Sequence, residues 1–198
     1  MHEHTDLKIS RPFYMKKTIY TIQHGLLKNG LFKASPNKNA RPNTQDIRLI
    51  IVHGISLPPE EFGNHCIDDF FLNKLNPEEH PYFKEIDHLQ VSAHLLIRRD
   101  GSITQFVPFD ERAWHAGVSA FNGKENCNDF SIGIELEGTD QLAYTEAQYL
   151  ELSRCCRSLI KNYPLITKNN IVGHCDVAPG RKTDPGKSFD WDKFQSLL

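Results

Sequence analysis

The chain has 198 residues, of which 39% are hydrophobic and 24% are charged, a composition typical of one globular domain with a substantial core. A formal net charge of -2 gives no electrostatic reason for the chain to bind nucleic acid or an anionic membrane. No apolar run approaches the roughly 20 residues of a membrane helix. The first residues, MHEHTDLKISRPFYMKK, carry charges with no apolar core behind them, so we expect no secretory signal and a cytosolic location.

The N-terminal region differs in composition from the rest of the chain. Residues 1–44 are rich in Asn, Lys, Pro and Gly, which favours loops over packed structure. We expect an N-terminal extension and arm over residues 1–44 and one folded domain over residues 45–198. Met15 offers an alternative start, which would make residues 1–14 dispensable. The histidines of this region, His2, His4 and His24, are interpreted as solvated surface residues.

The five cysteines match no CxxC zinc pattern, and their number is odd. Two of them, Cys155 and Cys156, are adjacent on a predicted helix and cannot face one partner together. In a cytosolic protein we expect all five as reduced thiols.

The first core element is a continuous aliphatic run, Ile47–His53, which predicts a strand buried on both faces. It ends in His53, which is either a satisfied core histidine or a site residue at a strand end. Residues 60–75 look partly helical, with Ile67, Phe70 and Phe71 in one apolar stripe. A long polar loop is expected from there to residue 87.

A hairpin is predicted next, because Asp100-Gly101 separates two strand-like runs at 91–99 and 102–109. His94 lies within the first run, and we interpret it as a structural or supporting residue. The loop Trp114–Gly117 combines an aromatic residue and a histidine with small residues. It indicates a closely packed rim that could touch a ligand.

Residues 131–137, SIGIELE, alternate cleanly between apolar and polar side chains. The Ile/Leu face is expected under a helix, so the face with Glu135 and Glu137 must look at solvent or a cleft. Gly133 leaves space beside Glu135. On this segment alone both glutamates read as ordinary solvent-facing strand residues, and for Glu137 we keep that interpretation.

The C-terminal part supplies two helices and a short strand. Thr145 and Gln148 form a capping box ahead of a helix over 146–162. Residues 171–174 predict a short strand that delivers His174, and Ser188 or Asp190 can cap a last helix. The order β, α, β-hairpin, β, α, β, α predicts a single α/β domain with a central mixed sheet flanked by helices.

Three residues of this framework form a set that zinc favours. Catalytic zinc sites use three protein ligands and leave one position open. Two imidazoles and a carboxylate, His53, His174 and Asp184, lie at predicted strand ends or in the loop after one. Neither histidine belongs to an HExxH motif, so the pattern leaves the triplet open. Cys175 follows His174 directly and would point to the opposite face of a strand, which argues against it as a ligand.

Two further residues suit the chemistry of such a site. In an extended segment Lys182 and Asp184 point to the same side, so Lys182 can stabilise negative charge that develops beside a metal. Glu135 can take a proton from a water molecule. The alternative for Lys182 is a plain surface lysine.

Four long motifs of the sequence can be compared with a known family. The segments are VHGISLPPEEFG (52–63), HPYFKEIDHLQVSAHLLIRRDGSITQFVPFDERAWHAGVS (80–119), NDFSIGIELEGTD (128–140) and GHCDVAPGRKTDPGKSFDW (173–191). They resemble, in the same order, the AmpD family of cytosolic 1,6-anhydro-N-acetylmuramyl-L-alanine amidases of Gram-negative bacteria. This family belongs to the zinc amidase superfamily that includes phage T7 lysozyme and the peptidoglycan recognition proteins. The likeness runs from about Leu49 to the C-terminus.

The resemblance implies an amidase fold with one catalytic Zn2+. Its motifs place the metal ligands on His53, His174 and Asp184, the catalytic glutamate on Glu135 and the catalytic lysine on Lys182. It implies hydrolysis of the amide between the lactyl group of (1,6-anhydro-)N-acetylmuramic acid and L-alanine, in cytosolic peptidoglycan recycling. The expected partner is an anhydromuropeptide, with no nucleic acid and no membrane, and we expect a monomer.

The chain departs from the family pattern at three positions. Gly54 replaces an asparagine, and Gln90 and Asn126 replace arginines that help to hold the peptide carboxylates. The far end of the peptide is therefore expected to be bound less tightly, or to be bound by cationic side chains at other positions. The candidate cations are Arg98, Arg99, Lys124 and Arg181. Two alternative functions stay open: an amidase that acts on intact polymeric peptidoglycan, and a non-catalytic muropeptide-binding protein.

Overall fold

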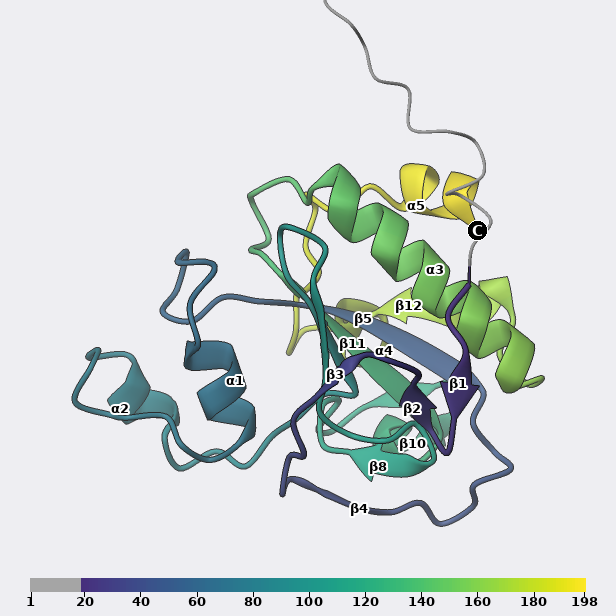
Figure 1. Ribbon diagram of the computed structural model, residues 1–198, viewed down its shortest axis with the longest axis horizontal. Coiled ribbons are helices and arrows are strands. Elements are labelled where there is room, and N and C mark those ends of the chain that lie inside the picture. Colours follow the sequence, from purple (N-terminus) through teal and green to yellow (C-terminus); the bar gives the residue numbers. More distant parts are fainter. Residues whose placement is uncertain (1–18) are drawn as a thin grey trace, which may run out of the picture.

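A six-stranded sheet runs through the computed structural model, which describes residues 19–198 (Figure 1). The strand order is β12-β5-β11-β6-β7-β3, and the four strands from β12 to β6 run parallel to one another. β7 is antiparallel to β6, and β3 is parallel to β7. The predicted mixed sheet is therefore confirmed. Its strands are β3 (Leu31–Phe32), β5 (Leu49–Ile55), β6 (Leu95–Ile97), β7 (Ile103–Gln105), β11 (Ser131–Glu137) and β12 (Ile171–Gly173).

The helices around this sheet form two pairs, and one further short helix follows β12 (Figure 1). α3 (Glu146–Asn162) and α5 (Trp191–Leu197) cover one face, whereas α1 (Cys66–Phe71) and α2 (Phe83–Ile86) lie together at one side. The short α4 (His174–Val177) follows β12 directly. The remaining elements are β1 (Ile22–Gln23), β2 (Leu26–Leu27), β4 (Lys38–Ala40), β8 (Glu111–Ala113), β9 (Ala120–Phe121), β10 (Lys124–Glu125), and the 3-10 turns η2 (Cys127–Asp129) and η3 (Lys168–Asn170).

The main core lies between α3 and the apolar face of β11. Ile132, Ile134 and Leu136 pack there with Tyr149 and Leu152, as the alternation of the strand predicts. α3 begins at the predicted capping box, in which the Thr145 hydroxyl accepts a hydrogen bond from the Gln148 amide. The opposite face of β11 is left for polar side chains, and it forms the floor of the site described below.

The N-terminal region contributes to the sheet. β3 forms its edge beyond β7 and β4 pairs with β8, so residues 31–40 are part of the folded unit. Arg41 is buried and donates hydrogen bonds to the carbonyl oxygens of Phe109 and Ser131, which fixes the segment against the start of β11. The division of the chain at residue 44 stays a prediction. The predictions for His2, His4, Met15 and residues 1–14 lie outside the described residues.

Several boundaries differ from the sequence-based expectation. The helix expected within 60–75 is confined to α1, although Ile67, Phe70 and Phe71 are buried as predicted. The loop expected up to residue 87 contains the single turn α2. The hairpin is confirmed, with Gly101 at φ +88° in its turn, but its strands span only three residues each. Within residues 19–198, no helix is both long and apolar enough to cross a membrane.

The interpretation of Glu137 as a solvated residue is wrong. Its side chain is buried, at 1% exposure, and it accepts hydrogen bonds from the guanidinium of Arg98 and the backbone amide of Gly63. Arg98 also pairs with Asp68 in α1. Glu137 thus joins the central strand to the α1 region through buried, fully paired charges.

Candidate active site

The register of the parallel strands brings three site residues to one edge of the sheet. His53 in β5 lies directly beside Glu135 in β11, and Gly173 at the end of β12 lies beside Val52. The next residue, His174, therefore follows next to His53. The structure places His174 at the first position of α4, and the prediction that it ends the strand is wrong. The strand stops one residue earlier because the chain turns into the helix at Gly173.

Three electron-rich atoms converge at this edge. Nδ1 of His53 and Nδ1 of His174 are 3.0 Å apart, and Oδ2 of Asp184 lies 3.2 Å from the first and 3.1 Å from the second. Tetrahedral zinc with bonds of about 2.0–2.1 Å holds its ligand atoms about 3.3 Å apart. The three atoms thus have the spacing of one metal coordination sphere, and the predicted triplet is brought together.

The remote ring nitrogens of both histidines agree with this arrangement. Nε2 of His174 lies 3.2 Å from the carbonyl oxygen of Ala116, which only accepts, so Nε2 carries the proton and Nδ1 keeps its lone pair. Nε2 of His53 lies 3.0 Å from Nδ1 of His115, which can accept its proton. A hydrogen-bonded remote nitrogen is the usual companion of a ligating imidazole. The residues therefore fit a metal, because two lone pairs and a carboxylate would otherwise repel one another.

Burial and charge hold these groups in the protonation states that a metal needs. Burial lowers the pKa of His53 to about 4, which keeps its imidazole neutral. Burial alone would raise the pKa of Asp184, but the adjacent side chains of His174 and His53 hold that pKa far below its usual range. A neutral imidazole and an ionised carboxylate are the binding forms.

Glu135 lies beside the three converging atoms without a partner of its own. Its Oε1 is 3.9 Å from Nδ1 of His53, and its buried Oε2 has no hydrogen-bond partner in the described part of the chain. Burial, followed by the negative charge of Asp184, raises its pKa well above the usual value, while Lys182 opposes the rise. An unpaired buried carboxylate with a raised pKa is a group suited to accept a proton near neutral pH.

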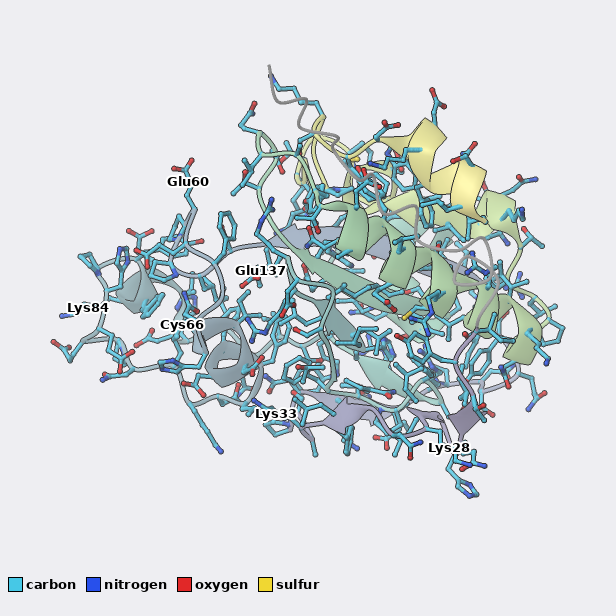
Figure 2. The ribbon with its side chains drawn as sticks, turned by 45° about the horizontal axis from the view of Figure 1, so that its top comes forward. Lys28, Lys33, Glu60, Cys66, Lys84 and Glu137 are labelled. Carbon is cyan, nitrogen blue, oxygen red and sulfur yellow. The ribbon has the colours of Figure 1, made fainter. Side chains whose placement is uncertain are left out.

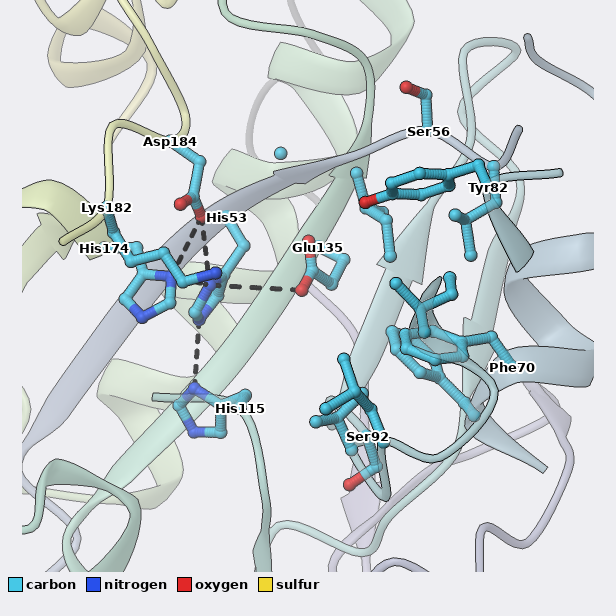
Figure 3. Close-up of a pocket in the computed structure, with 17 residues that line it drawn as sticks. His53, Ser56, Phe70, Tyr82, Ser92, His115, Glu135, His174, Lys182 and Asp184 are labelled. Atoms are coloured by element: carbon cyan, nitrogen blue, oxygen red, sulfur yellow. Dashed lines mark hydrogen bonds and ion pairs between the residues drawn. The ribbon is translucent and has the colours of Figure 1, made fainter. Parts of the chain in front are cut away.

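A cavity of about 300 Å³ connects these groups to solvent (Figure 3). The converging triplet, Glu135 and Lys182 form one end, and apolar side chains that include Phe70 and Tyr82 form the other. Lys182 is exposed and lines the same space as Asp184, as the sequence predicts, although the segment that carries both is a turn rather than a strand. The cavity can thus hold a molecule with one polar and one apolar part.

Comparisons with known proteins agree with this geometry. The family model for N-acetylmuramoyl-L-alanine amidase matches residues 43–187. The chain is 54% identical over 182 residues to the 1,6-anhydro-N-acetylmuramyl-L-alanine amidase AmpD of Haemophilus influenzae, which covers 92% of this chain and 99% of that protein. It also resembles a crystal structure of a selenomethionine derivative of AmpD, with a TM-score of 0.87, 56% identity, and coverage of 90% of this chain and 99% of that one.

The chain belongs to the N-acetylmuramoyl-L-alanine amidase family. The resemblance inferred from its four motifs is confirmed. A more distant relative in this family is the amidase AmiD from Escherichia coli, solved in complex with the substrate anhydro-N-acetylmuramic acid-L-Ala-D-γ-Glu-L-Lys. That structure has a TM-score of 0.58 and 30% identity to this chain, and the match covers 80% of this chain and 60% of that one.

The sequence placed His115 in a rim loop that could touch a ligand, and it lines the cavity, but its contact with His53 was not predicted. His115, in the rim loop, extends the pair of histidines: its Nδ1 faces His53, and its Nε2 lies 3.3 Å from the Ser131 hydroxyl. Its ring lies so close to β11 that a Cβ on Gly133 would come within 2.5 Å of it. A glycine inside a strand often marks such a close approach, so Gly133 was the signal that could have revealed His115.

Asp184 is held in place from two sides. Its carbonyl oxygen accepts a hydrogen bond from the Cys175 amide, and the next carbonyl, of Pro185, accepts one from the hydroxyl of Tyr144. A Cβ at Gly54 would lie 2.4 Å from that hydroxyl. The missing side chain at Gly54 thus gives Tyr144 room to reach the segment that carries Asp184.

Proposed function

We propose that this amidase hydrolyses the amide between the lactyl group of 1,6-anhydro-N-acetylmuramic acid and L-alanine of the stem peptide, in cytosolic recycling of peptidoglycan. The observation that carries the proposal is the convergence of two imidazole lone pairs and a carboxylate beside an unpaired buried glutamate. The identity to AmpD over nearly the whole chain supports the substrate, and AmiD was solved with a substrate of the same class.

His53, His174 and Asp184 would hold Zn2+. The bound ion supplies a water whose pKa is lowered to about 7 and polarises the amide carbonyl. In this assignment His115 and the carbonyl oxygen of Ala116 orient the two imidazoles through their remote ring nitrogens. The ligand atoms are already at the required spacing, so little reorganisation is needed on binding.

Glu135 acts as the general base and then as the general acid. Its unpaired oxygen accepts the proton of the attacking water and donates it to the amine of L-alanine as the carbon–nitrogen bond breaks. The raised pKa of its carboxyl group makes both transfers feasible near neutral pH. Lys182, at the same end of the cavity, stabilises the negative charge that develops on the carbonyl oxygen.

Arg181 is the cation best suited to hold the peptide carboxylates. Arg98 is already paired with two carboxylates, and Lys124 with one. Arg99 lies over the ring of Phe62 and donates to a backbone carbonyl.

Arg181, by contrast, is exposed, and within residues 19–198 it donates to the carbonyl oxygens of Ala116 and Val118 and pairs with no carboxylate. It lines a surface hollow together with Asn126, where the family arginine is missing.

The test is hydrolysis of an anhydromuropeptide by the zinc-loaded chain, followed by chromatography of the released peptide. We expect release of free peptide, and its loss in a His174→Ala variant. Tight binding without release would instead indicate a muropeptide-binding protein. A parallel assay on intact sacculi separates the third possibility, because faster release from sacculi than from anhydromuropeptide would indicate an enzyme of the polymeric wall.

A further inference from the structure

A second group of metal-ligating side chains lies outside the cavity, at the start of α1. Single ligand atoms of His65, Cys66 and Glu79 all lie within 4.8 Å of one another. His65 and Cys66 begin the helix, and Glu79 comes from the loop that precedes α2. Figure 2 shows Cys66 in the part of the molecule formed by α1 and α2, away from the main body of the sheet. The amidase chemistry uses none of these residues.

The thiol of Cys66 is the unusual member of this group. Cys66 is 7% exposed, and its sulfur makes no hydrogen bond to any residue in the described part of the chain. It is thus more than nine-tenths buried and still lies within reach of an imidazole nitrogen and a carboxylate oxygen. Cys66 also packs in the apolar cluster around α1, as buried cysteines commonly do, so the two polar ligand atoms beside it are what distinguish this thiol.

The other two members are exposed, and each has one polar neighbour, Asp69 for His65 and Asn76 for Glu79. His65 occupies the N-cap position of α1, but its side chain makes no capping hydrogen bond. It is well exposed, and its Nε2 lies 3.5 Å from Oδ2 of Asp69, one turn along the helix. Glu79 is exposed as well. Bonds of about 2.0–2.3 Å to a central ion would place the three atoms about 3.3–3.7 Å apart, closer than the 4.8 Å within which they now lie, and exposed side chains can make this movement.

The side-chain charges that act most strongly on the thiol are negative. Burial, followed by the charges of Glu79, Asp69 and Glu61, raises the pKa of Cys66, so the thiol is protonated without a cation. Sulfur, imidazole and carboxylate together suit zinc and related thiophilic ions, and they do not suit calcium or magnesium, which prefer oxygen. A divalent cation bound beside Cys66 would be attracted by the negative charges of Glu79, Asp69 and Glu61.

We propose that His65, Cys66 and Glu79 form a second site for a thiophilic divalent cation, with Asp69 available as a fourth ligand. Binding replaces the S–H bond by a sulfur–metal bond and releases that proton to solvent. The site joins the first turn of α1 to the loop before α2. Both segments continue into walls of the cavity, at Phe70 and Tyr82, so an ion here holds the apolar end of the cavity together.

The experiment is a titration of the metal-free chain with Cd2+, followed by the ultraviolet thiolate-to-metal charge-transfer absorption and by equilibrium dialysis. We expect two Cd2+ ions per chain, of which one produces the absorption. Cys66→Ser removes that absorption and the second ion. His65→Ala, a change at an exposed side chain, weakens the second ion at least tenfold. The matched control Cys156→Ser, at a buried thiol of α3 that belongs to neither group of ligands, leaves both ions and the absorption in place.

The first and second sites are separated by His174→Ala, which removes the ion of the amidase site and leaves the ion at Cys66. Binding of the ion at Cys66 can therefore be tested independently of the proposed amidase mechanism. One Cd2+ per chain in the unmodified protein would overturn it, and so would absorption that survives in Cys66→Ser. Full affinity in both His65→Ala and Glu79→Gln would also overturn it, because a lone thiol adduct would then explain the signal.

Discussion

Two glutamates lie on the same face of β11, and changing each to glutamine should have opposite effects: one change should lower activity and the other should lower stability. Glu135 is buried with one oxygen unpaired, and burial raises its pKa. Glu137, two residues along, is buried with Arg98 and backbone amides as partners. Glu135→Gln therefore removes a charge that the fold does not stabilise, whereas Glu137→Gln weakens a buried ionic network.

The magnitudes follow from these partners. A positioned general base contributes about 10²–10⁴ in rate, so we expect kcat of Glu135→Gln to fall by about that factor, or about 2.7–5.4 kcal/mol in barrier height. Its free energy of unfolding without metal should match or exceed that of the unmodified chain. Glu137→Gln should lose about 1.5–3 kcal/mol of unfolding free energy, because hydrogen bonds to charged groups are lost, and keep most of its kcat.

The assay combines three measurements on each variant: peptide release from anhydromuropeptide, zinc content by elemental analysis, and urea unfolding after removal of the metal. Zinc content must stay equal to that of the unmodified chain in both variants for kcat to be compared. Turnover of Glu135→Gln within tenfold of the unmodified chain would refute the role of Glu135 as base. A larger loss of stability in Glu135→Gln than in Glu137→Gln would refute the assignment of the partners.

Other changes test the remaining parts of the site. Lys182→Ala should keep the zinc of the amidase site and raise the barrier of the reaction by about 2.7–4 kcal/mol, which lowers kcat. Asp184→Ala should lose that zinc, which elemental analysis measures. Equal zinc loss in both variants would contradict this division of roles. His115→Phe should weaken zinc about 10–100-fold in competition with a chelator, because it removes the acceptor for His53; unchanged affinity would show that His115 only packs. Arg181→Gln should raise KM up to about fivefold with little change in kcat, and an unchanged KM would point to another cation. The free energy of unfolding of the metal-free chain should fall as the pH falls from 6.5 to about 4, because His53 takes up a proton in the unfolded chain at a higher pH than in the folded chain. The expected loss from this residue is about 3 kcal/mol. A His53→Gln variant that loses the same free energy of unfolding over this pH range would disprove it.

The elements with strong local signals were predictable from the sequence. The helix over 146–162 begins and ends where the capping box and Pro164 indicate, because both signals act within one helical turn. The strand over 131–137 also agrees with its alternation. The role of Glu137 was not predictable in this way. Its partner Arg98 comes from a different strand, and alternation says only which side of the sheet a residue takes.

The composition of the site was predictable, but its geometry was not. Residue chemistry pointed to His53, His174 and Asp184, yet their separation of about 3 Å depends on strand order, which no local pattern encodes. The contact of His115 with His53 was not predicted for the same reason, since it joins two distant segments. In β11 itself the sequence showed only the gap that Gly133 leaves, and the ring that fills this gap comes from the rim loop.

The parallel register explains why one edge of this sheet carries the whole site. His53 and Glu135 are direct neighbours across β5 and β11, so the ligand and the neighbouring carboxylate cannot shift independently along their strands. β12 on the other side of β5 ends one residue earlier, and the helix that follows turns His174 toward the same point. Because parallel strands end at a common edge, His53 and Glu135 from two strands meet His174 at the start of the helix after a third. Asp184 and Lys182 come from one loop, and Tyr144 and Cys175 hold that loop through its backbone.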